Sequence, residues 1–247
     1  MDMGALTDPA LPRRRAHLRQ YLHARSLALL GVLFAAIWLF VELAEEMLEG
    51  ETQDFDQALL LAFRSPLDPA DPLGPAWLET VMRDITALGG VTVLGFVTLA
   101  VLGLLWFQSR RRAAGLLLLA IIGGQIFSNV SKAIFDRPRP DLVPHGTLVT
   151  SASFPSGHSM MAAVVWLTLA AMLARMQPSR ALKVYLIALA VAVTLAVGLS
   201  RVWLGVHWPT DVLAGWAAGA AWALICRALA EVLDPLPDPV PAPAPPR

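Results

Sequence analysis

The chain has 247 residues, of which 56% are hydrophobic and 15% are charged. Soluble domains usually carry about 25% charged residues, so this composition, with its long apolar runs, indicates an integral membrane protein. Basic and acidic residues balance to a net charge of zero, which gives no indication of nucleic-acid binding. The single cysteine, Cys226, lies in an apolar run and excludes an intrachain disulfide.

The N-terminal part predicts a basic segment followed by a membrane helix. Residues 1–26 contain five arginines, and residues 27 to about 43 are apolar apart from Glu42. A signal peptide begins in a similar way, but this apolar core is long and no small-residue cleavage site follows it. We therefore expect residues 1–26 to lie in the cytoplasm and the first spanning helix to remain uncleaved.

The next segment, 44–84, is rich in acids and proline. The stretch from Phe55 to Phe63 is short and amphipathic, and the prolines between 66 and 75 interrupt any helix. The piece from Pro75 to Leu88 fits two interpretations. It is either a helix at the membrane interface, with Trp77 at headgroup depth, or a solvated loop.

Five further apolar runs are each close to the ~20 residues that cross a bilayer. They cover residues 85–107, 113–131, 159–176, 181–199 and 210–230. We predict an all-α membrane protein: a six-transmembrane-helix bundle over 27–233, with a short helical extracytoplasmic segment between the first and second spans. The Pro-rich tail, 234–247, is expected to be disordered.

Basic residues set the orientation, because cytoplasmic loops are enriched in Lys and Arg. Six spans place residues 1–26, the Arg110–Arg112 turn and the 175–183 turn on one side, which we assign to the cytoplasm. Three polar segments, 132–140, 154–158 and 200–211, then share the extracytoplasmic face. We expect a multi-pass protein of the cell (inner) membrane with its site on that face.

The first polar segment offers two cations. Gln125, Asn129 and Lys132 share one helix face, so Lys132 either faces the bundle interior or extends to the headgroups. Arg139 stands between two prolines that stiffen the backbone, and an arginine fork matches phosphate oxygens. The alternative is a basic loop that attracts anionic lipid. We assign the neighbouring Arg137 a secondary role at most.

The other two segments open helices. Ser156 and Gly157 precede a helix whose first N–H groups form an anion site, and His158 lies there as a ligand or as a surface cap. Asp211 either caps the helix that begins near Pro209 or reaches back to the ring of His207.

Together these segments resemble the type 2 phosphatidic acid phosphatase family of membrane lipid phosphatases, which is related to bacterial acid phosphatases and vanadium haloperoxidases. The family signatures are Lys-x6-Arg-Pro, Pro-Ser-Gly-His and Ser-Arg-x5-His-x3-Asp. All three are present: Lys132 to Pro140, Pro155 to His158, and Ser200 to Asp211. They span about a third of the chain, and the likeness elsewhere is one of topology.

The resemblance implies a role for each matched residue. His207 would attack phosphorus to form a phosphohistidine, Asp211 would orient it, and His158 would protonate the leaving oxygen and then activate water. The phosphate-binding residues would be Lys132, Arg139, Ser156, Gly157 and Arg201. Three fixed cations take the place of a metal, so we predict no metal and no cofactor.

A phosphate site reached from the bilayer suits a lipid phosphate, with membrane lipids as surroundings. The family offers undecaprenyl diphosphate, phosphatidylglycerol phosphate, phosphatidic acid and lipid A phosphates. Two alternatives are an anion or lipid transporter, which predicts charges at mid-membrane, and a vanadate-dependent haloperoxidase-like enzyme. No feature of the sequence indicates an oligomeric state.

Overall fold

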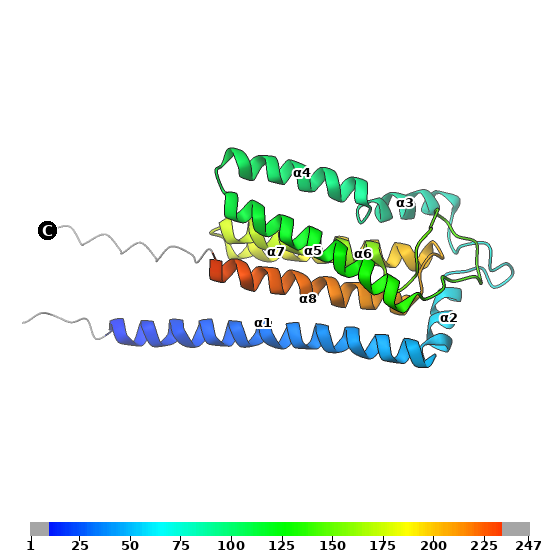
Figure 1. The fold of residues 1–247 in the computed structure, drawn as a ribbon, viewed down its shortest axis with the longest axis horizontal. Coiled ribbons are helices and arrows are strands. Elements are labelled where there is room, and N and C mark those ends of the chain that lie inside the picture. Colours follow the sequence, from blue (N-terminus) through cyan, green and yellow to red (C-terminus); the bar gives the residue numbers. More distant parts are fainter. Residues whose placement is uncertain (1–9, 234–247) are drawn as a thin grey trace, which may run out of the picture.

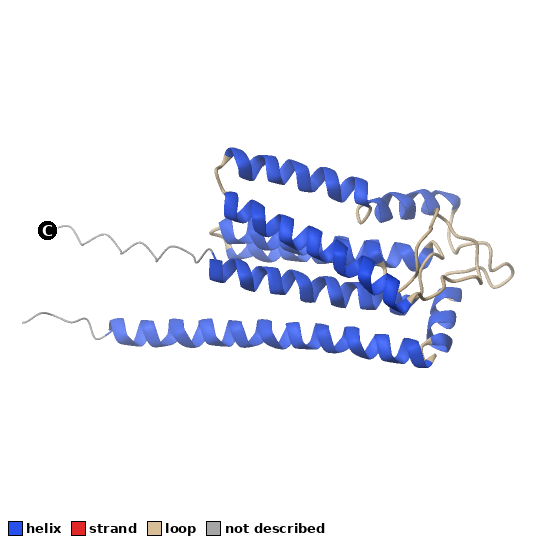
Figure 2. Ribbon diagram, in the orientation of Figure 1, coloured by secondary structure: helices blue, strands red, loops and turns tan. Residues whose placement is uncertain are grey.

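The computed structural model describes residues 10–233, and every regular element in that range is a helix (Figures 1 and 2). They are α1 (Ala10–Glu49), α2 (Gln53–Leu61), α3 (Ala76–Ala87), α4 (Val91–Phe107), α5 (Arg111–Phe135), α6 (Gly157–Met176), α7 (Arg180–Trp203) and α8 (Pro209–Leu233). Residues 1–9 and the tail predicted at 234–247 lie outside the described range.

The predicted six-helix membrane fold is confirmed. Five stretches are long and apolar enough to cross a bilayer: Ser26–Glu49 of α1, and α5, α6, α7 and α8. The count reaches six if α3 and α4, whose axes bend by 43° at a short break, are taken together as one bent span. We expected a continuous second span from residue 85, but the helix breaks at residues 88–90 and the apolar part begins at Val91.

The break has a packing reason. A Cβ atom on Gly89 would lie 2.5 Å from Cγ1 of Val197 and 3.0 Å from the carbonyl oxygen of His158. Only glycine lets the chain pass this close to α6 and α7. The indole of Trp166 donates to the carbonyl oxygen of Leu88 at 3.1 Å and ties the break to α6.

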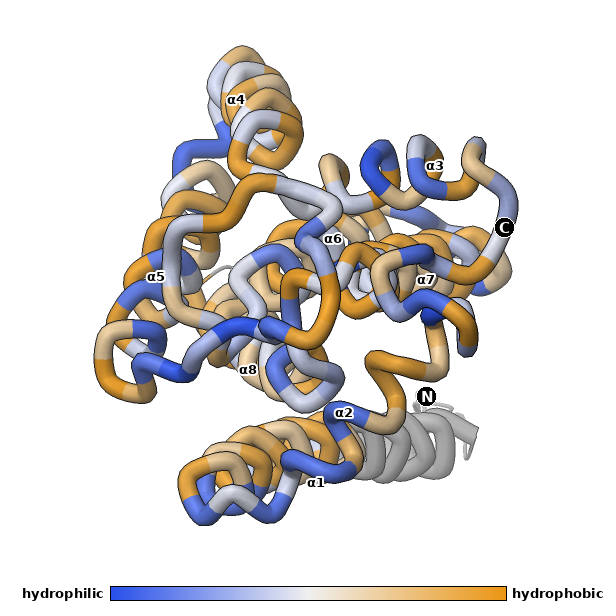
Figure 3. The backbone as a smooth tube through the Cα atoms, turned by 90° about the vertical axis from the view of Figure 1, so that its right-hand side faces the viewer, coloured by the Kyte–Doolittle hydropathy of each residue, from blue (hydrophilic) through white to orange (hydrophobic). Residues whose placement is uncertain are grey.

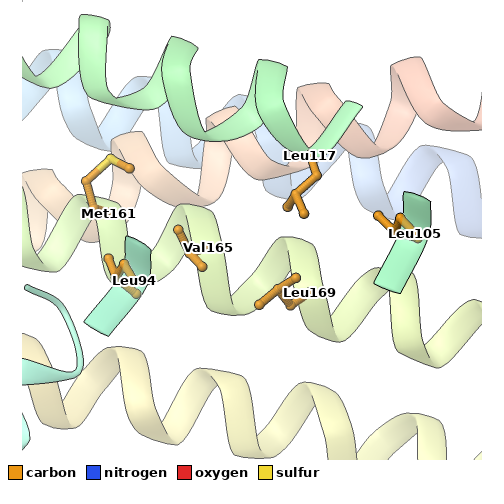
Figure 4. Close-up of a cluster of buried hydrophobic side chains, with 6 residues drawn as sticks. All are labelled: Leu94, Leu105, Leu117, Met161, Val165 and Leu169. Carbon is orange, nitrogen blue, oxygen red and sulfur yellow. The ribbon is translucent and has the colours of Figure 1, made fainter. Parts of the chain in front are cut away.

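The bundle is built around α6 and α8, which are the most buried of the spans. Small residues let them approach: a Cβ atom on Gly219 would lie 2.5 Å from the carbonyl oxygen of Met160. A second apolar cluster joins α4 and α5 to α6 (Figure 4); it contains Leu94, Leu105, Leu117, Met161, Val165 and Leu169. Figure 3 shows α4 and α1 at opposite edges of the bundle.

The connections are distributed unevenly between the two ends. Helices α2 and α3, the long 136–156 loop and the turn between α7 and α8 lie together at one end, which we call the loop end (Figure 1). The Arg110–Arg112 turn and the turn between α6 and α7 lie at the other end. All three polar segments are therefore brought to the loop end.

Candidate active site

A cavity of about 970 Å³ opens at the loop end. Six of the eight predicted site residues line it: Lys132, Arg139, Gly157, His158, Arg201 and His207. Asp211 lies directly behind His207, and Ser156 lies beside the cavity without lining it. These six site residues, from Lys132 to His207, are spread over 75 positions of the chain and line the same cavity.

His207 stands in the turn between α7 and α8 with 1% of its surface exposed. Its Nε2 atom lies 3.2 Å from Nη1 of Arg139, and its Nδ1 atom lies 3.3 Å from Oδ2 of Asp211. Because a guanidinium can only donate, Nε2 must be the acceptor and Nδ1 must bear the proton. This tautomer leaves the Nε2 lone pair directed to the cationic side of the cavity.

Burial lowers the pKa of His207 well below its usual 6.5, and Arg201, Arg139, Lys132 and His158 lower it further. The ring is therefore neutral at neutral pH, which is the form that has a lone pair on one ring nitrogen. A neutral imidazole held by a carboxylate on one nitrogen can act as a nucleophile through the other.

Asp211, at the start of α8, is fully buried and accepts from four groups. Arg137 donates to Oδ1 at 2.7 Å; the Trp208 backbone N–H donates to Oδ2 at 2.9 Å, and the Ser153 hydroxyl donates to the same oxygen. The fourth donor is Nδ1 of His207. Both alternatives from the sequence apply, because Asp211 reaches His207 and also accepts the N–H that precedes its own helix.

The three signature cations come from three different elements. Arg201, in the last turn of α7, is 2% exposed and donates to Oγ1 of Thr86 at 3.0 Å, while its Nε has no partner in the described part of the chain. Arg139 donates to the carbonyl oxygens of Ser151 and Val206 at 2.7 and 2.6 Å. Lys132 donates to the carbonyl oxygen of Ala152 rather than extending to the lipid.

The start of α6 supplies the remaining polar groups. Gly157 and His158 are its first residues, and a Cβ atom on Gly157 would lie 3.5 Å from Cε of Lys132. The N-terminal N–H groups and the positive helix dipole favour an anion here. Ser156 is the N-cap of α6: its hydroxyl oxygen accepts the Ser159 backbone N–H at 3.4 Å and the Ser159 hydroxyl at 2.8 Å. Its predicted contact with phosphate stays a prediction.

Sequence reasoning missed two contacts of this site. The Ser153 hydroxyl lies 3.3 Å from Nδ1 of His207 and also donates to Asp211; its only signal was its place just before the Phe154–His158 segment. Asp56 of α2 is 1% exposed and pairs with Arg137 at 2.7 Å. In the sequence it is one acid among many in 44–84.

One geometric observation bears on the prediction that catalysis needs no metal ion. Between residues 10 and 233, no group of three or more His, Cys, Asp or Glu side chains is arranged to hold a metal ion. The groups around the cavity are cations, imidazoles and N–H donors, which suit an anion rather than a metal. Metal independence stays a prediction.

Comparisons with known proteins identify relatives of this chain. A model of the PAP2 superfamily matches residues 113–233. The chain is 43% identical over 149 residues to phosphatidylglycerophosphatase B of Bacillus subtilis (strain 168), covering 58% of this chain and 70% of the relative. It is 30% identical over 131 residues to undecaprenyl-diphosphatase of Sulfolobus acidocaldarius, covering 51% of this chain and 59% of that protein.

Among solved structures, the crystal structure of a transmembrane PAP2-type phosphatidylglycerolphosphate phosphatase from Bacillus subtilis is similar, with a TM-score of 0.73 and 29% sequence identity. The match covers 83% of this chain and 98% of that one.

Proposed function

This chain belongs to the PAP2 superfamily, and we propose from that premise that it hydrolyses the phosphate or diphosphate of a membrane lipid through a phosphohistidine on His207. One observation carries the proposal. Nε2 of His207 has its lone pair directed into a cavity that Lys132, Arg139, Arg201 and His158 also line.

In the first step, Nε2 of His207 attacks phosphorus and the bond to the leaving oxygen breaks. His158, in its protonated form, gives its proton to that oxygen. The three cations and the N-terminal N–H groups of α6 bind the equatorial phosphoryl oxygens, where charge is spread in the transition state. Asp211 stabilises the positive charge that forms on the ring of His207.

In the second step, His158, now neutral, takes a proton from water. The water oxygen attacks phosphorus, the bond between Nε2 and phosphorus breaks, and inorganic phosphate leaves. No step needs a metal ion, because the fixed cations supply the positive charge that a metal supplies in other phosphatases.

The shape of the cavity supports a lipid substrate. Its wall toward α4 and α5 is apolar and includes Leu94, Leu99, Leu102, Leu118, Ile122 and Ile126. Leu99, Ile122 and Ile126 are also exposed on the outside of the helices. A phosphate can therefore bind among the cations while its hydrocarbon chain lies between α4 and α5 and continues into the bilayer.

Orientation and substrate class follow from charge and relatives. The basic turns at 110–112 and 175–183 lie opposite the loop end. Because basic turns favour the cytoplasm, they support our proposal that the cavity opens on the extracytoplasmic side of the cell membrane. The relatives that are 43% and 30% identical are named for phosphatidylglycerol phosphate and undecaprenyl diphosphate. We therefore propose a glycerolipid phosphate or a polyprenyl diphosphate as the substrate.

The test is phosphate release by purified protein from phosphatidylglycerol phosphate, undecaprenyl diphosphate, phosphatidic acid and a lipid A phosphate. His207→Ala should lower kcat by ~10⁴-fold or more, the scale found when a covalent nucleophile is removed. His145→Gln is the matched control, because His145 contacts the Pro140 carbonyl oxygen in the same loop but does not line the cavity. If His207→Ala hydrolyses any of these lipids at the wild-type rate, the proposal is refuted.

A further inference from the structure

Two buried carboxylates from different helices share one guanidinium. Arg137 donates through Nη1 to Oδ1 of Asp211 and through Nη2 to Oδ2 of Asp56, both at 2.7 Å. The two carboxylate side chains are at most 1% exposed, and the Arg137 side chain is 11% exposed. Arg137 also donates to the hydroxyls of Thr210 and Thr52, at 2.9 and 3.2 Å.

Asp211 needs this partner. A buried carboxylate is stable in its charged form only when it is paired and hydrogen-bonded. Its other donors are neutral: the Ser153 hydroxyl, the Trp208 N–H and the His207 ring. The signature cations donate elsewhere, so within residues 10–233 Arg137 is the one permanent cation in contact with Asp211.

Asp56 fixes the other side of the guanidinium. Its Oδ1 atom accepts the backbone N–H of Thr210 at 2.9 Å, and its Oδ2 atom accepts the Thr210 hydroxyl at 2.7 Å. Helix α2 and the first turn of α8 are thereby bound to the same arginine. Movement of α2 away from α8 would change the direction in which Asp211 points.

Arg137 does not line the large cavity that contains His207. It lines a separate cavity of about 330 Å³ on the other side of Asp211, together with Met47, Gly50, Thr52, Asp56 and Trp208. Its guanidinium carbon lies 5.7 Å from the centre of the Trp208 ring. A substrate bound beside His207 therefore does not touch Arg137, and any effect of this residue on turnover passes through Asp211.

We propose that Arg137, held by Asp56, is a positioning residue that keeps Asp211 ionised and directed at Nδ1 of His207. The inference rests on the proposed function, because it assigns Arg137 an effect on the nucleophile. Without Arg137, the carboxylate loses its cation and Oδ1 loses its donor. His207 then spends less time in the tautomer that has its lone pair on Nε2.

The test compares Arg137→Ala, Arg137→Lys and wild type in purified form with one lipid phosphate. Arg137→Ala should lower kcat by about 10- to 100-fold, the range found when an outer partner of a catalytic ligand is removed. KM should not change, because Arg137 does not contact substrate. Arg137→Lys, which keeps the charge but not the fork, should have an intermediate kcat.

Rescue separates positioning from a purely structural role. Guanidinium ion, at concentrations that do not affect wild type, should enter the cavity of about 330 Å³ and restore part of the kcat of Arg137→Ala. Arg227→Ala is the matched control, because Arg227 pairs with Glu231 at the far end of α8 and should give wild-type kcat with no response to guanidinium.

Three outcomes would overturn the inference: wild-type kcat in Arg137→Ala, an increase in KM with kcat unchanged, or a folded Arg137→Ala protein that guanidinium does not rescue. If Arg137→Ala does not fold, Arg137→Lys decides, since reduced kcat at unchanged KM supports positioning and wild-type kcat refutes it. Absence of phosphate release by wild type would refute the proposed function instead.

Discussion

Ser153 is a residue that neither the composition nor the motifs identify, and its substitution tests the contacts that hold His207. Its hydroxyl donates to Oδ2 of Asp211 and lies 3.3 Å from Nδ1 of His207, so it contacts both members of the pair. In Ser153→Ala, Oδ2 loses a donor, and His207 loses an oxygen to which its Nδ1–H can donate. The side chain is fully buried, so bulk water does not replace the lost contact.

The expected fall in kcat of Ser153→Ala follows from the charge of the hydrogen-bond acceptor, the Asp211 carboxylate. A hydrogen bond to a charged group contributes about 1.5–3 kcal/mol. If that contribution is lost in the transition state, kcat falls by about 10- to 150-fold. KM should stay constant, because Ser153 does not line the substrate cavity.

The assay is steady-state phosphate release, together with the thermal midpoint of the purified variant in detergent. Ser131→Ala is the matched control: Ser131 is a buried serine of α5 that makes no hydrogen bond to His207 or Asp211, and it should keep wild-type kcat. If Ser153→Ala keeps wild-type kcat, our account of the His207 tautomer is wrong. A fall in kcat that matches a loss of folded protein would contradict it equally.

Three further predictions follow from the same site. His158→Ala should accumulate phosphoenzyme from p-nitrophenyl phosphate, because this leaving group needs no proton while the second step loses its water activation. Mass spectrometry of quenched protein would detect the phosphoenzyme. An unmodified chain would contradict the proposed double role of His158. Treatment with a chelator should leave kcat unchanged, and a loss that Mg²⁺ or Zn²⁺ restores would reveal a metal. Gly89→Ala should lower kcat, because its Cβ atom would lie 3.0 Å from the carbonyl oxygen of His158, whereas Gly115→Ala, which meets nothing within 4 Å, should not.

The sequence predicted most of the fold because hydrophobic length and basic turns are local signals. The apolar spans and the grouping of the polar segments at one end needed no tertiary information. The bend at residues 88–90 was not predictable in this way, since it depends on Val197 and Trp166 from helices later in the chain. Of the two interpretations of 75–88, the helix is the one that forms, as α3.

For the site, the motifs identified residues that line the cavity but not the contacts that hold them. Lys132 could have extended to the headgroups, and only the position of Ala152 shows that it turns inward. Ser156 matches the signature, but the sequence does not show that its hydroxyl oxygen accepts from the Ser159 hydroxyl. Asp56 is 155 residues from Asp211, and nothing in the acidic 44–84 segment distinguishes it from acids that face solvent.

The contacts place the cations of the cavity wall on one side of His207 and the Asp211–Arg137 pair on the other. The cavity wall contains Lys132, Arg139 and Arg201 with no acid among its lining residues, so an empty cavity has uncompensated positive charge. Behind His207, the negative charge of Asp211 is already balanced by Arg137. If Asp211 faced the cavity it would pair with these cations and weaken phosphate binding. Because it is bound from behind, Asp211 can orient the proposed nucleophile, His207, without reducing the field that would attract a phosphate dianion.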